Sequence, residues 1–162
     1  MRSSTRTLSS WLPGPALRTS TVRATHALAA ELAATLRAGD VLALVGDLGA
    51  GKTELVRGLV AALGAPPDTA VCSPSFLLLN LYRGGRLPVA HYDAYFMDSA
   101  DDLERAGLDD LRRQGWLTVV EWADRVASAL PASTRWLELA RVPGDEGARE
   151  ARLDGAPAGE PR

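Results

Sequence analysis

Residues 41–63 read VLALVGDLGAGKTELVRGLVAAL, and this stretch decides the fold. Its first five residues form an unbroken apolar run, which is typical of a strand buried on both faces of a parallel sheet. Between positions 52 and 63 the apolar side chains recur at helical spacing, at Leu55, Val56, Leu59, Val60 and Leu63. Gly64 then ends the helix. The stretch therefore predicts a buried strand, a glycine-rich loop and an amphipathic helix.

The loop of this unit matches the phosphate-binding pattern G-x-x-x-x-G-K-[ST] in full. Its residues are Gly46, Asp47, Leu48, Gly49, Ala50, Gly51, Lys52 and Thr53, and Glu54 follows in the first helical turn. Glycines let main-chain amides approach phosphate oxygens closely, and the helix directs its positive end at the anion. Lys52, the only lysine in the chain, is expected to reach the β- and γ-phosphates, and the Thr53 hydroxyl to ligate Mg²⁺. The loop therefore predicts a bound nucleoside triphosphate.

The rest of the chain alternates between helical and strand patterns. The expected helices cover 25–37, with Thr21 or Thr25 near the start, 100–113, with Gly107 as a candidate break, and 124–130. The expected strands cover 76–82, 87–93, 116–120 and 136–142. The first two are joined by Arg83-Gly84-Gly85-Arg86, which indicates a hairpin. These patterns predict an α/β fold like that of P-loop NTPases, with three layers, a mixed and mostly parallel central sheet, and an inserted β-hairpin.

The length of 162 residues suits one domain with a substantial core. We expect this domain to cover 19–142. It would lie between a disordered N-terminal extension over 1–18 and a flexible C-terminal tail over 143–162, which is rich in Gly, Ala, Pro and charge. No apolar run approaches the roughly 18 residues that a membrane-spanning helix needs, so no membrane partner is expected.

Charge and cysteine content restrict the setting in which the protein works. The formal net charge of −2 argues against a protein that grips nucleic acid alone through a broad basic face. The single cysteine, Cys72, allows no intramolecular disulfide, which suits a reducing compartment. We therefore expect a cytoplasmic protein, and any contact with nucleic acid would be made through a partner.

Two acidic residues follow expected strands and are candidates for the other half of the nucleotide site. Glu121 follows the apolar run 117–120, and Asp93 follows residues 87–92. If both strands lie beside the first strand, both carboxylates point into one site. There they can hold Mg²⁺ or its waters, or polarise the attacking water. The residues alone do not divide these roles between the two acids.

Two further residues have more than one interpretation, and a third has a single one. Ser75, in the segment SPSF at 73–76, bears a hydroxyl in a loop that could sense a γ-phosphate through Mg²⁺ or could be a plain turn. Trp122 directly follows Glu121 and could stack on a base, pack against a partner or fill the core. His91 is interpreted as a structural histidine.

Four motifs occur in order along the chain, namely GDLGAGKT at 46–53, SPSF at 73–76, HYDAY at 91–95 and VEWA at 120–123. With this combination the chain resembles the TsaE family, also called YjeE, from about Leu17 to Val142. Its members are small bacterial ATPases needed to make threonylcarbamoyladenosine in tRNA. The P-loop alone is common among NTPases, and the later motifs make the resemblance specific. Ser75 stands where the family usually has Thr, and Phe96 stands where it usually has Arg.

The resemblance implies roles for these residues and partners for the protein. Lys52 and Thr53 would serve the phosphates of ATP and Mg²⁺, and Asp93 and Glu121 would serve Mg²⁺ and hydrolysis. Ser75 would belong to a switch-like loop. The partners would be TsaD and TsaB, which carry the transfer chemistry and the tRNA, and ATP hydrolysis would reset their complex between turnovers.

Three other functions compete with this interpretation. A small-molecule kinase would use Asp93 to position an acceptor hydroxyl and would need an arginine-rich lid, which Arg105, Arg112 and Arg113 could supply. A nucleotide-binding adaptor would bind the nucleotide and hydrolyse almost none of it. A GTPase of the Ras type needs an Asn-Lys-x-Asp segment, and a chain with no lysine other than Lys52 has none.

Overall fold

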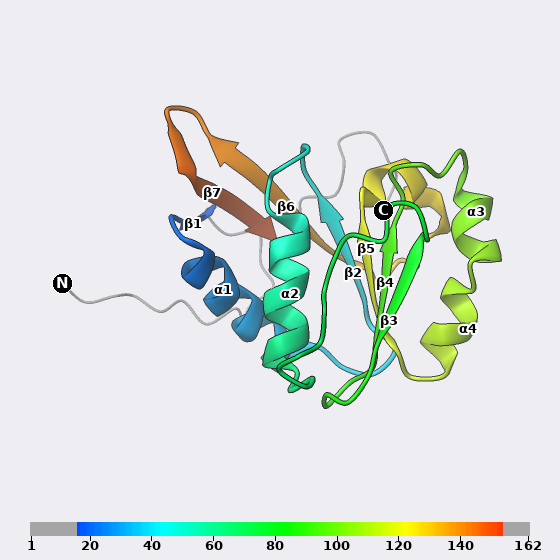
Figure 1. Cartoon of the computed structure of the whole chain (residues 1–162). Helices are drawn as coiled ribbons and strands as arrows, with labels where there is room; N and C mark the ends of the chain where they lie inside the picture. The colour runs from blue at the N-terminus through cyan, green and yellow to red at the C-terminus, as the bar shows by residue number, and fades with distance from the viewer. Residues whose placement is uncertain (1–15, 154–162) are drawn as a thin grey trace.

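The computed structural model describes residues 16–153 as one seven-stranded sheet with helices on both faces (Figure 1). The strands are β1 (Leu17–Thr19), β2 (Val41–Val45), β3 (Leu79–Tyr82), β4 (Val89–Asp93), β5 (Leu117–Glu121), β6 (Arg135–Val142) and β7 (Asp145–Leu153). The helices are α1 (Val22–Thr35), α2 (Lys52–Ala62), α3 (Ala100–Arg105), α4 (Leu108–Arg113) and the 3-10 helix η1 (Ala123–Ala129). In the described part of the chain, no helix combines the length and hydropathy that a membrane span requires.

The sheet has the strand order β1-β7-β6-β2-β5-β4-β3. Its centre is parallel, because β2 pairs in parallel with both β5 and β6, and β5 pairs in parallel with β4. The edges are antiparallel, with β3 on β4 at one side and β7 on β6 and β1 at the other. The expected hairpin is confirmed as β3–β4. The expected mixed sheet is confirmed and is partly parallel: three of its six strand pairings are parallel, and the other three, including those across the short connections β3–β4 and β6–β7, are antiparallel.

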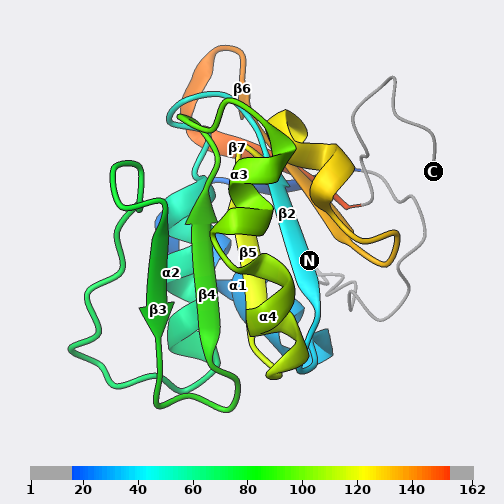
Figure 2. The same cartoon turned by 90° about the vertical axis from the view of Figure 1, so that its right-hand side faces the viewer.

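The two faces of the sheet are covered by different helices, which gives three layers (Figure 2). On one face α1 and α2 bury Leu32 and Leu59 against Leu42 of β2. On the other face α3, α4 and η1 form a second core, in which Leu103 packs with Tyr92 of β4. A parallel strand whose residues alternate between two such cores must be apolar throughout, which explains the unbroken run in β2.

Most element boundaries differ from the expected ones for local reasons. Helix α1 begins at Val22, and of the two residues expected near its start Thr21 is the N-cap, which accepts a hydrogen bond from the Ala24 amide at 3.0 Å. The expected break of the helix over 100–113 is confirmed at Gly107, which has φ 87° and precedes α4. Strand β3 begins later than expected, because a turn closed by the Leu78 amide on the Pro74 carbonyl precedes it.

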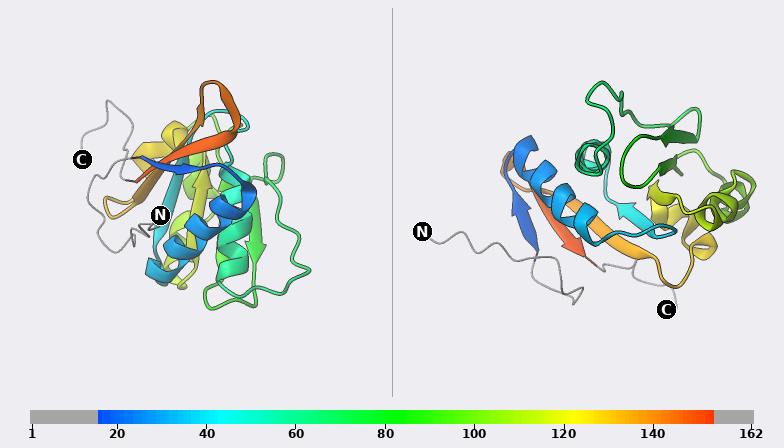
Figure 3. Two further views of the ribbon diagram at one scale, coloured as in Figure 1. Left: turned by 90° about the vertical axis from the view of Figure 1, so that its left-hand side faces the viewer. Right: turned by 90° about the horizontal axis from the view of Figure 1, so that it is seen from below.

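The C-terminal segment differs most from expectation. The flexible tail expected over 143–162 is wrong for residues 145–153, which form β7 between β6 and β1 (Figure 3). The expected extension over 1–18 also included Leu17 and Arg18, which belong to β1. The folded unit therefore runs from β1 to β7 and is longer than the expected 19–142. Residues 1–15 and 154–162 lie outside the described residues, so the expectations for them stand untested.

Candidate functional site

The central strands β2, β5 and β4 point their carboxyl ends the same way, towards one end of the sheet. Residues at and after these strand ends line a pocket of about 490 Å³. Open sheets with parallel central strands bind their ligands just beyond the carboxyl ends of those strands. The glycine-rich loop after β2 forms one side of the pocket. Asp93 and Glu121 end β4 and β5 as direct register partners, and they form the other side. The two acids that the sequence singled out are thus neighbours, facing the loop.

The loop over 46–51 lies outside helix α2, which begins at Lys52. Two of its glycines lie close to β6, Gly46 against its backbone and Gly49 against a side-chain end. A Cβ on Gly46 would lie 2.2 Å from the carbonyl oxygen of Leu139. Gly49 has φ 75°, and a Cβ there would lie 2.1 Å from Nη2 of Arg141. The loop is therefore packed tightly against β6, and it presents its other side to the pocket.

The Lys52 side chain is buried in the loop that it follows. Its ammonium group donates hydrogen bonds to the carbonyl oxygens of Gly46 and Asp47, the latter at 2.9 Å, and lies 3.9 Å from the ring centroid of Trp122. Burial lowers the pKa of Lys52 from its ordinary value of 10.5, and the negative charges of Glu121 and Asp93 act in the opposite direction. A desolvated ammonium held mainly by carbonyl dipoles is suited to receive an anion.

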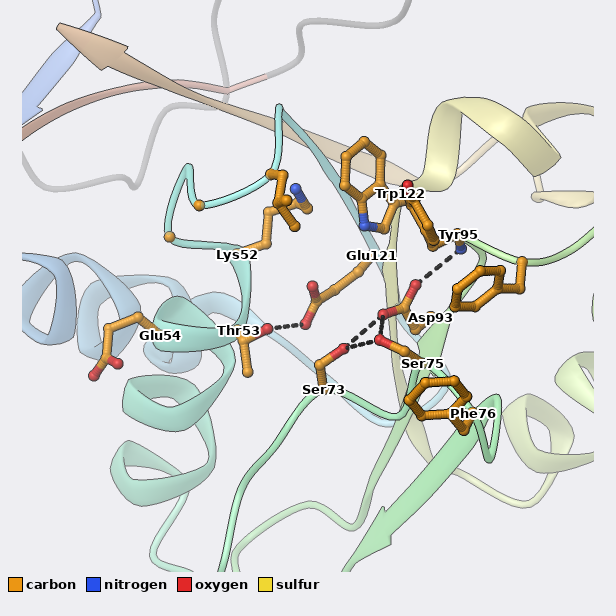
Figure 4. A pocket seen from close by; sticks show the side chains of 14 residues that line it. Lys52, Thr53, Glu54, Ser73, Ser75, Phe76, Asp93, Tyr95, Glu121 and Trp122 are labelled. Atoms are coloured by element: carbon orange, nitrogen blue, oxygen red, sulfur yellow. Dashed lines mark hydrogen bonds between the residues drawn. The ribbon is translucent and has the colours of Figure 1, made fainter.

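The Glu121 carboxylate joins the loop side of the pocket to the sheet (Figure 4). Its Oε1 accepts a hydrogen bond from Oγ1 of Thr53 at 2.9 Å and lies 2.8 Å from Nε2 of His91. His91 is fully buried, and its Nδ1 lies 3.3 Å from the Tyr82 hydroxyl. Thr53 and Glu121, predicted as site residues from different parts of the sequence, are thus in direct contact.

The Asp93 carboxylate is bound by the loop that follows α2. Its Oδ2 accepts hydrogen bonds from the hydroxyls of Ser73 at 2.6 Å and Ser75 at 2.9 Å, and its Oδ1 accepts one from the Tyr95 amide at 2.9 Å. All three donors are neutral, and Asp93 is 1% exposed. The loop over 73–76 therefore contacts the acid at the end of β4, as a switch-like loop would.

The chemistry of this donor set fits a magnesium ion. A threonine hydroxyl and two carboxylates at one edge of a pocket are the hard oxygen ligands that Mg²⁺ accepts, and it commonly takes one or two carboxylates together with waters. Thr53 already contacts Glu121, and Asp93 lies in register beside it. The three hydrogen-bond donors to Asp93 are neutral, so its carboxylate can still accept a cation as a ligand.

Two contacts in the site were missed by the sequence analysis. His91 is the buried, hydrogen-bonded histidine that the sequence predicted, but its contact with Glu121 was not foreseen. Ser73 contacts Asp93 as closely as Ser75 does. The signal for His91 was its place two residues before Asp93 in a strand, since alternate residues share a face of the sheet. For Ser73 the only signal was its hydroxyl in the same short loop as Ser75.

Aromatic side chains form the rim of the pocket. Trp122 has a left-handed backbone, with φ 55°, and its ring centroid lies 4.9 Å from that of Tyr95. Phe96 packs on Tyr95 at 4.8 Å between centroids and on Phe76 at 5.9 Å, and Phe76 is 91% exposed. A non-glycine residue with positive φ next to Glu121 is the kind of strain that gathers at functional sites.

Glu54 lines the pocket, but its side chain points away from the two carboxylates (Figure 4). It lies 2.6 Å from Nε2 of His26 and also pairs with Arg57. Burial acts to raise the pKa of Glu54, but these two hydrogen bonds outweigh it and hold the pKa below 4.5. The Glu54 side chain is thus engaged between α1 and α2.

The arginines considered for a kinase lid do not line the pocket. Arg105 pairs with Asp102 and Arg113 with Asp110, each within its own helix. Arg112 belongs to α4, a helix that Figure 1 shows away from the carboxyl end of β2. The arrangement therefore gives the kinase interpretation no support.

Comparison with known proteins identifies the family. The family model for the threonylcarbamoyl adenosine biosynthesis protein TsaE matches residues 19–151. The TsaE protein of Bacillus subtilis is 38% identical over 129 residues, which cover 80% of this chain and 79% of that protein. The TsaE protein of Treponema pallidum is 41% identical over 104 residues, covering 64% and 75%. The crystal structure of Bacillus subtilis YdiB superimposes with a TM-score of 0.71 at 33% identity, covering 85% of this chain and 82% of that one. The chain belongs to the TsaE family.

Proposed function

We propose that this protein binds and hydrolyses ATP with Mg²⁺, and that it thereby supports TsaD and TsaB in the threonylcarbamoyladenosine modification of tRNA. One observation carries the proposal. Lys52 and Thr53 of the phosphate-binding loop lie in the same pocket as two buried carboxylates, Asp93 and Glu121, and Thr53 contacts Glu121 directly. Family membership supports the assignment to the pathway.

Binding of the triphosphate would use the loop over 46–53 and the start of α2. The main-chain amides of the loop and of the first helical turn supply donors, and Lys52 supplies the positive charge. Because the side chain of Glu54 is bound to His26 and Arg57, Glu54 would contribute through its backbone amide. Trp122 stands at the rim beside Lys52 and would pack against the bound nucleotide.

Thr53, Asp93 and Glu121 would hold the metal ion. When bound, Mg²⁺ supplies positive charge that offsets the charge of the phosphate oxygens. Ser75 already donates to Asp93, so the loop over 73–76 would respond to what Asp93 holds. This gives Ser75 the switch-like role, in which its hydroxyl serves as the threonine of other family members would.

Hydrolysis would depend on Glu121 and Asp93. Both hydrogen bonds to Glu121 fall on Oε1, from Thr53 and His91. Oε2 is then the oxygen that can orient the attacking water or a metal-bound water. We assign this role to Glu121 and the primary metal contact to Asp93. A site of this kind is expected to be slow until partner proteins complete it.

Only membership of the TsaE family supports the proposed partner proteins. TsaD and TsaB would bind this chain, and the tRNA would be held by their complex. The net charge of −2 is consistent with a protein that does not grip tRNA alone. We place this activity in the cytoplasm, where the tRNA substrate and ATP are available.

The test measures ATP binding by titration calorimetry and the release of free phosphate, with and without TsaD and TsaB. Lys52→Ala is expected to weaken binding and abolish turnover, because the phosphates lose their principal cation. Glu121→Ala is expected to spare binding more than turnover. Unchanged ATP affinity in Lys52→Ala would contradict the phosphate site, and wild-type turnover in Glu121→Ala would transfer the hydrolytic role to Asp93. Phosphate appearing on an acceptor molecule in place of free phosphate would indicate a kinase.

A further inference from the structure

Two arginines of the β6–β7 hairpin reach the phosphate-binding loop from far along the chain. Nη2 of Arg141 donates to the carbonyl oxygen of Leu48 at 3.3 Å, and Nη2 of Arg149 donates to that of Gly49 at 3.3 Å. The two arginines are direct register partners on the antiparallel ladder, and the register shifts immediately after Arg141. Such a bulge re-aims side chains. The hairpin thus presents two guanidinium groups to neighbouring peptide units of one loop.

Arg141 and Arg149 bring two like charges face to face beside the loop. Like charges directly opposite on a ladder repel each other. Within residues 16–153, no carboxylate lies in ion-pair distance of Arg141 or Arg149, whereas five other arginines each have an acidic partner, namely Arg18, Arg57, Arg105, Arg113 and Arg152. The pair is therefore held by carbonyl oxygens, and its charge is concentrated beside the loop.

The two arginines contact the loop from outside the pocket. Leu48 and Gly49 line the pocket, whereas Arg141 and Arg149 do not. In a planar trans peptide the C=O and the N–H point in opposite directions. A guanidinium group bound to the Leu48 carbonyl therefore turns the Gly49 amide away from the hairpin. Arg149 is itself anchored, because its Nη1 donates to the carbonyl oxygens of Glu146 at 2.7 Å and Ala148 at 2.8 Å.

We infer that Arg141 and Arg149 are positioning residues that brace the phosphate-binding loop in the conformation that receives a polyphosphate. They hold the outer carbonyls of Leu48 and Gly49 and orient the two peptide units that contain them. The first unit ends in the Gly49 amide, which the Arg141 contact polarises as a donor to an anion. The second ends in the Ala50 amide, which donates to the Asp47 carbonyl at 3.0 Å and closes the loop. The C-terminal hairpin is thereby part of the nucleotide site. The inference rests on the proposed binding of ATP by this loop.

The experiment compares Arg141→Gln, Arg149→Gln and the double variant with the wild-type full chain. The affinities for ATP and ADP are measured by titration calorimetry in the presence of Mg²⁺, and thermal unfolding is measured without nucleotide. We expect the double variant to lose about tenfold in affinity, the value of one charged hydrogen bond. The loss should be similar for ATP and ADP, because the loop amides serve both. The unfolding temperature without nucleotide should change little, and lysine at both positions should restore affinity to within about threefold of wild type.

Two controls separate this inference from the function on which it rests. Arg152→Gln alters the same strand at a residue that pairs with Glu150, and it should bind ATP as wild type does. Lys52→Ala should lose ATP binding. If Lys52→Ala loses binding while the double glutamine variant keeps it, the bracing role is wrong and ATP binding stands. A loss confined to ATP would indicate direct contact with the terminal phosphate, and a parallel loss of folded stability would indicate a structural role. Either outcome would overturn the inference, and a wild-type chain that binds no ATP would overturn both.

Discussion

At the residue scale, the donors around the two buried carboxylates differ in kind. Asp93 is bound by hydroxyls and a backbone amide, and Glu121 by a hydroxyl and an imidazole. The serine and threonine donors can rotate away when a cation arrives, because their hydroxyls need only a small torsional change. The buried ring of His91 has no such freedom. His91 therefore fixes where Glu121 points, and the hydroxyls adapt around it.

Replacing His91 tests this fixed contact. In His91→Phe the ring volume is kept, but Glu121 loses a donor in a buried setting. We expect the free energy of unfolding to fall by about 1–3 kcal/mol, the cost of an unsatisfied buried polar group. Phosphate release should fall more than ATP affinity, because the loop proposed to bind the phosphates is unchanged. Urea unfolding, calorimetry and phosphate release check these values.

The control for this variant is His26→Phe, at a half-buried histidine that contacts Glu54 on the surface between α1 and α2. It should cost less stability and leave turnover close to wild type. If the two variants behave alike, the contact between His91 and Glu121 has no special role.

At the element scale, α1 and α2 approach each other closely at Gly58. A Cβ at this position would lie 2.9 Å from Cδ2 of His26 and 3.0 Å from Cβ of Ala29. Helices that cross at a glycine bring their backbones together and leave no space for a branched side chain. The start of α2, which carries Lys52 and Thr53, is therefore placed by this crossing.

A valine at position 58 should separate the two helices. We expect Gly58→Val to lower the free energy of unfolding by about 1–3 kcal/mol, the usual cost of overpacking a core. Ala62→Val, at an exposed position of the same helix, should cost at most about 0.7 kcal/mol through helix propensity alone. Denaturant unfolding of both variants measures the two losses of unfolding free energy. Equal losses would show that the space around Gly58 can accept a branched side chain.

The contribution of strand β7 to stability can also be tested. It pairs with β6 along most of its length and is the partner of β1. Its Ala148 and Ala151 are buried. A chain that ends at Pro143 loses β7 and leaves β1 without a ladder, so we expect a loss of about 3 kcal/mol or more in stability, or no cooperative unfolding.

A chain that ends at Leu153 keeps β7 and is the matched control. Thermal unfolding followed by circular dichroism distinguishes the two. If the chain that ends at Pro143 unfolds at the wild-type temperature, the strand assignment of residues 145–153 is wrong.

At the scale of the whole molecule, the core beneath α3, α4 and η1 limits the free energy of unfolding at high pH. Tyr92 is fully buried there, and its hydroxyl donates to the Ala106 carbonyl at 3.1 Å. Burial raises the pKa of Tyr92 to about 12. An unfolded chain ionises this group near its ordinary value of 10.0, so the stability that its neutral form contributes is complete below pH 10 and is lost as the pH rises towards 12.

Replacing Tyr92 removes this dependence. Wild type should lose about 2–3 kcal/mol of unfolding free energy between pH 10 and 12 through this residue, since one pKa unit corresponds to about 1.4 kcal/mol. Tyr92→Phe is expected to be less stable than wild type at pH 8 because a hydrogen bond is missing, and to show a shallower decline above pH 10. Urea unfolding at several pH values measures both slopes. Identical slopes would contradict the raised pKa.

The sequence by itself determined the parts of the protein whose signals are local. An unbroken apolar run, glycines at fixed spacing and a helical period identified β2, the loop over 46–53 and α2, because these properties depend on neighbours in the chain. An acid at the end of an expected strand likewise indicated Glu121 and Asp93 as candidate site residues. The motif order then led to the TsaE family, which the comparisons confirmed.

The tertiary structure alone decided what depends on residues far apart in sequence. Residues 145–153 read DEGAREARL, with too few large apolar side chains to predict a strand, and they become β7 only because β6 and β1 lie on either side. The contacts of His91 with Glu121 and of Arg149 with Gly49 span 30 and 100 positions. Such pairings follow from which strands are neighbours, and that depends on the energy of the whole sheet and its two cores, which no local pattern contains.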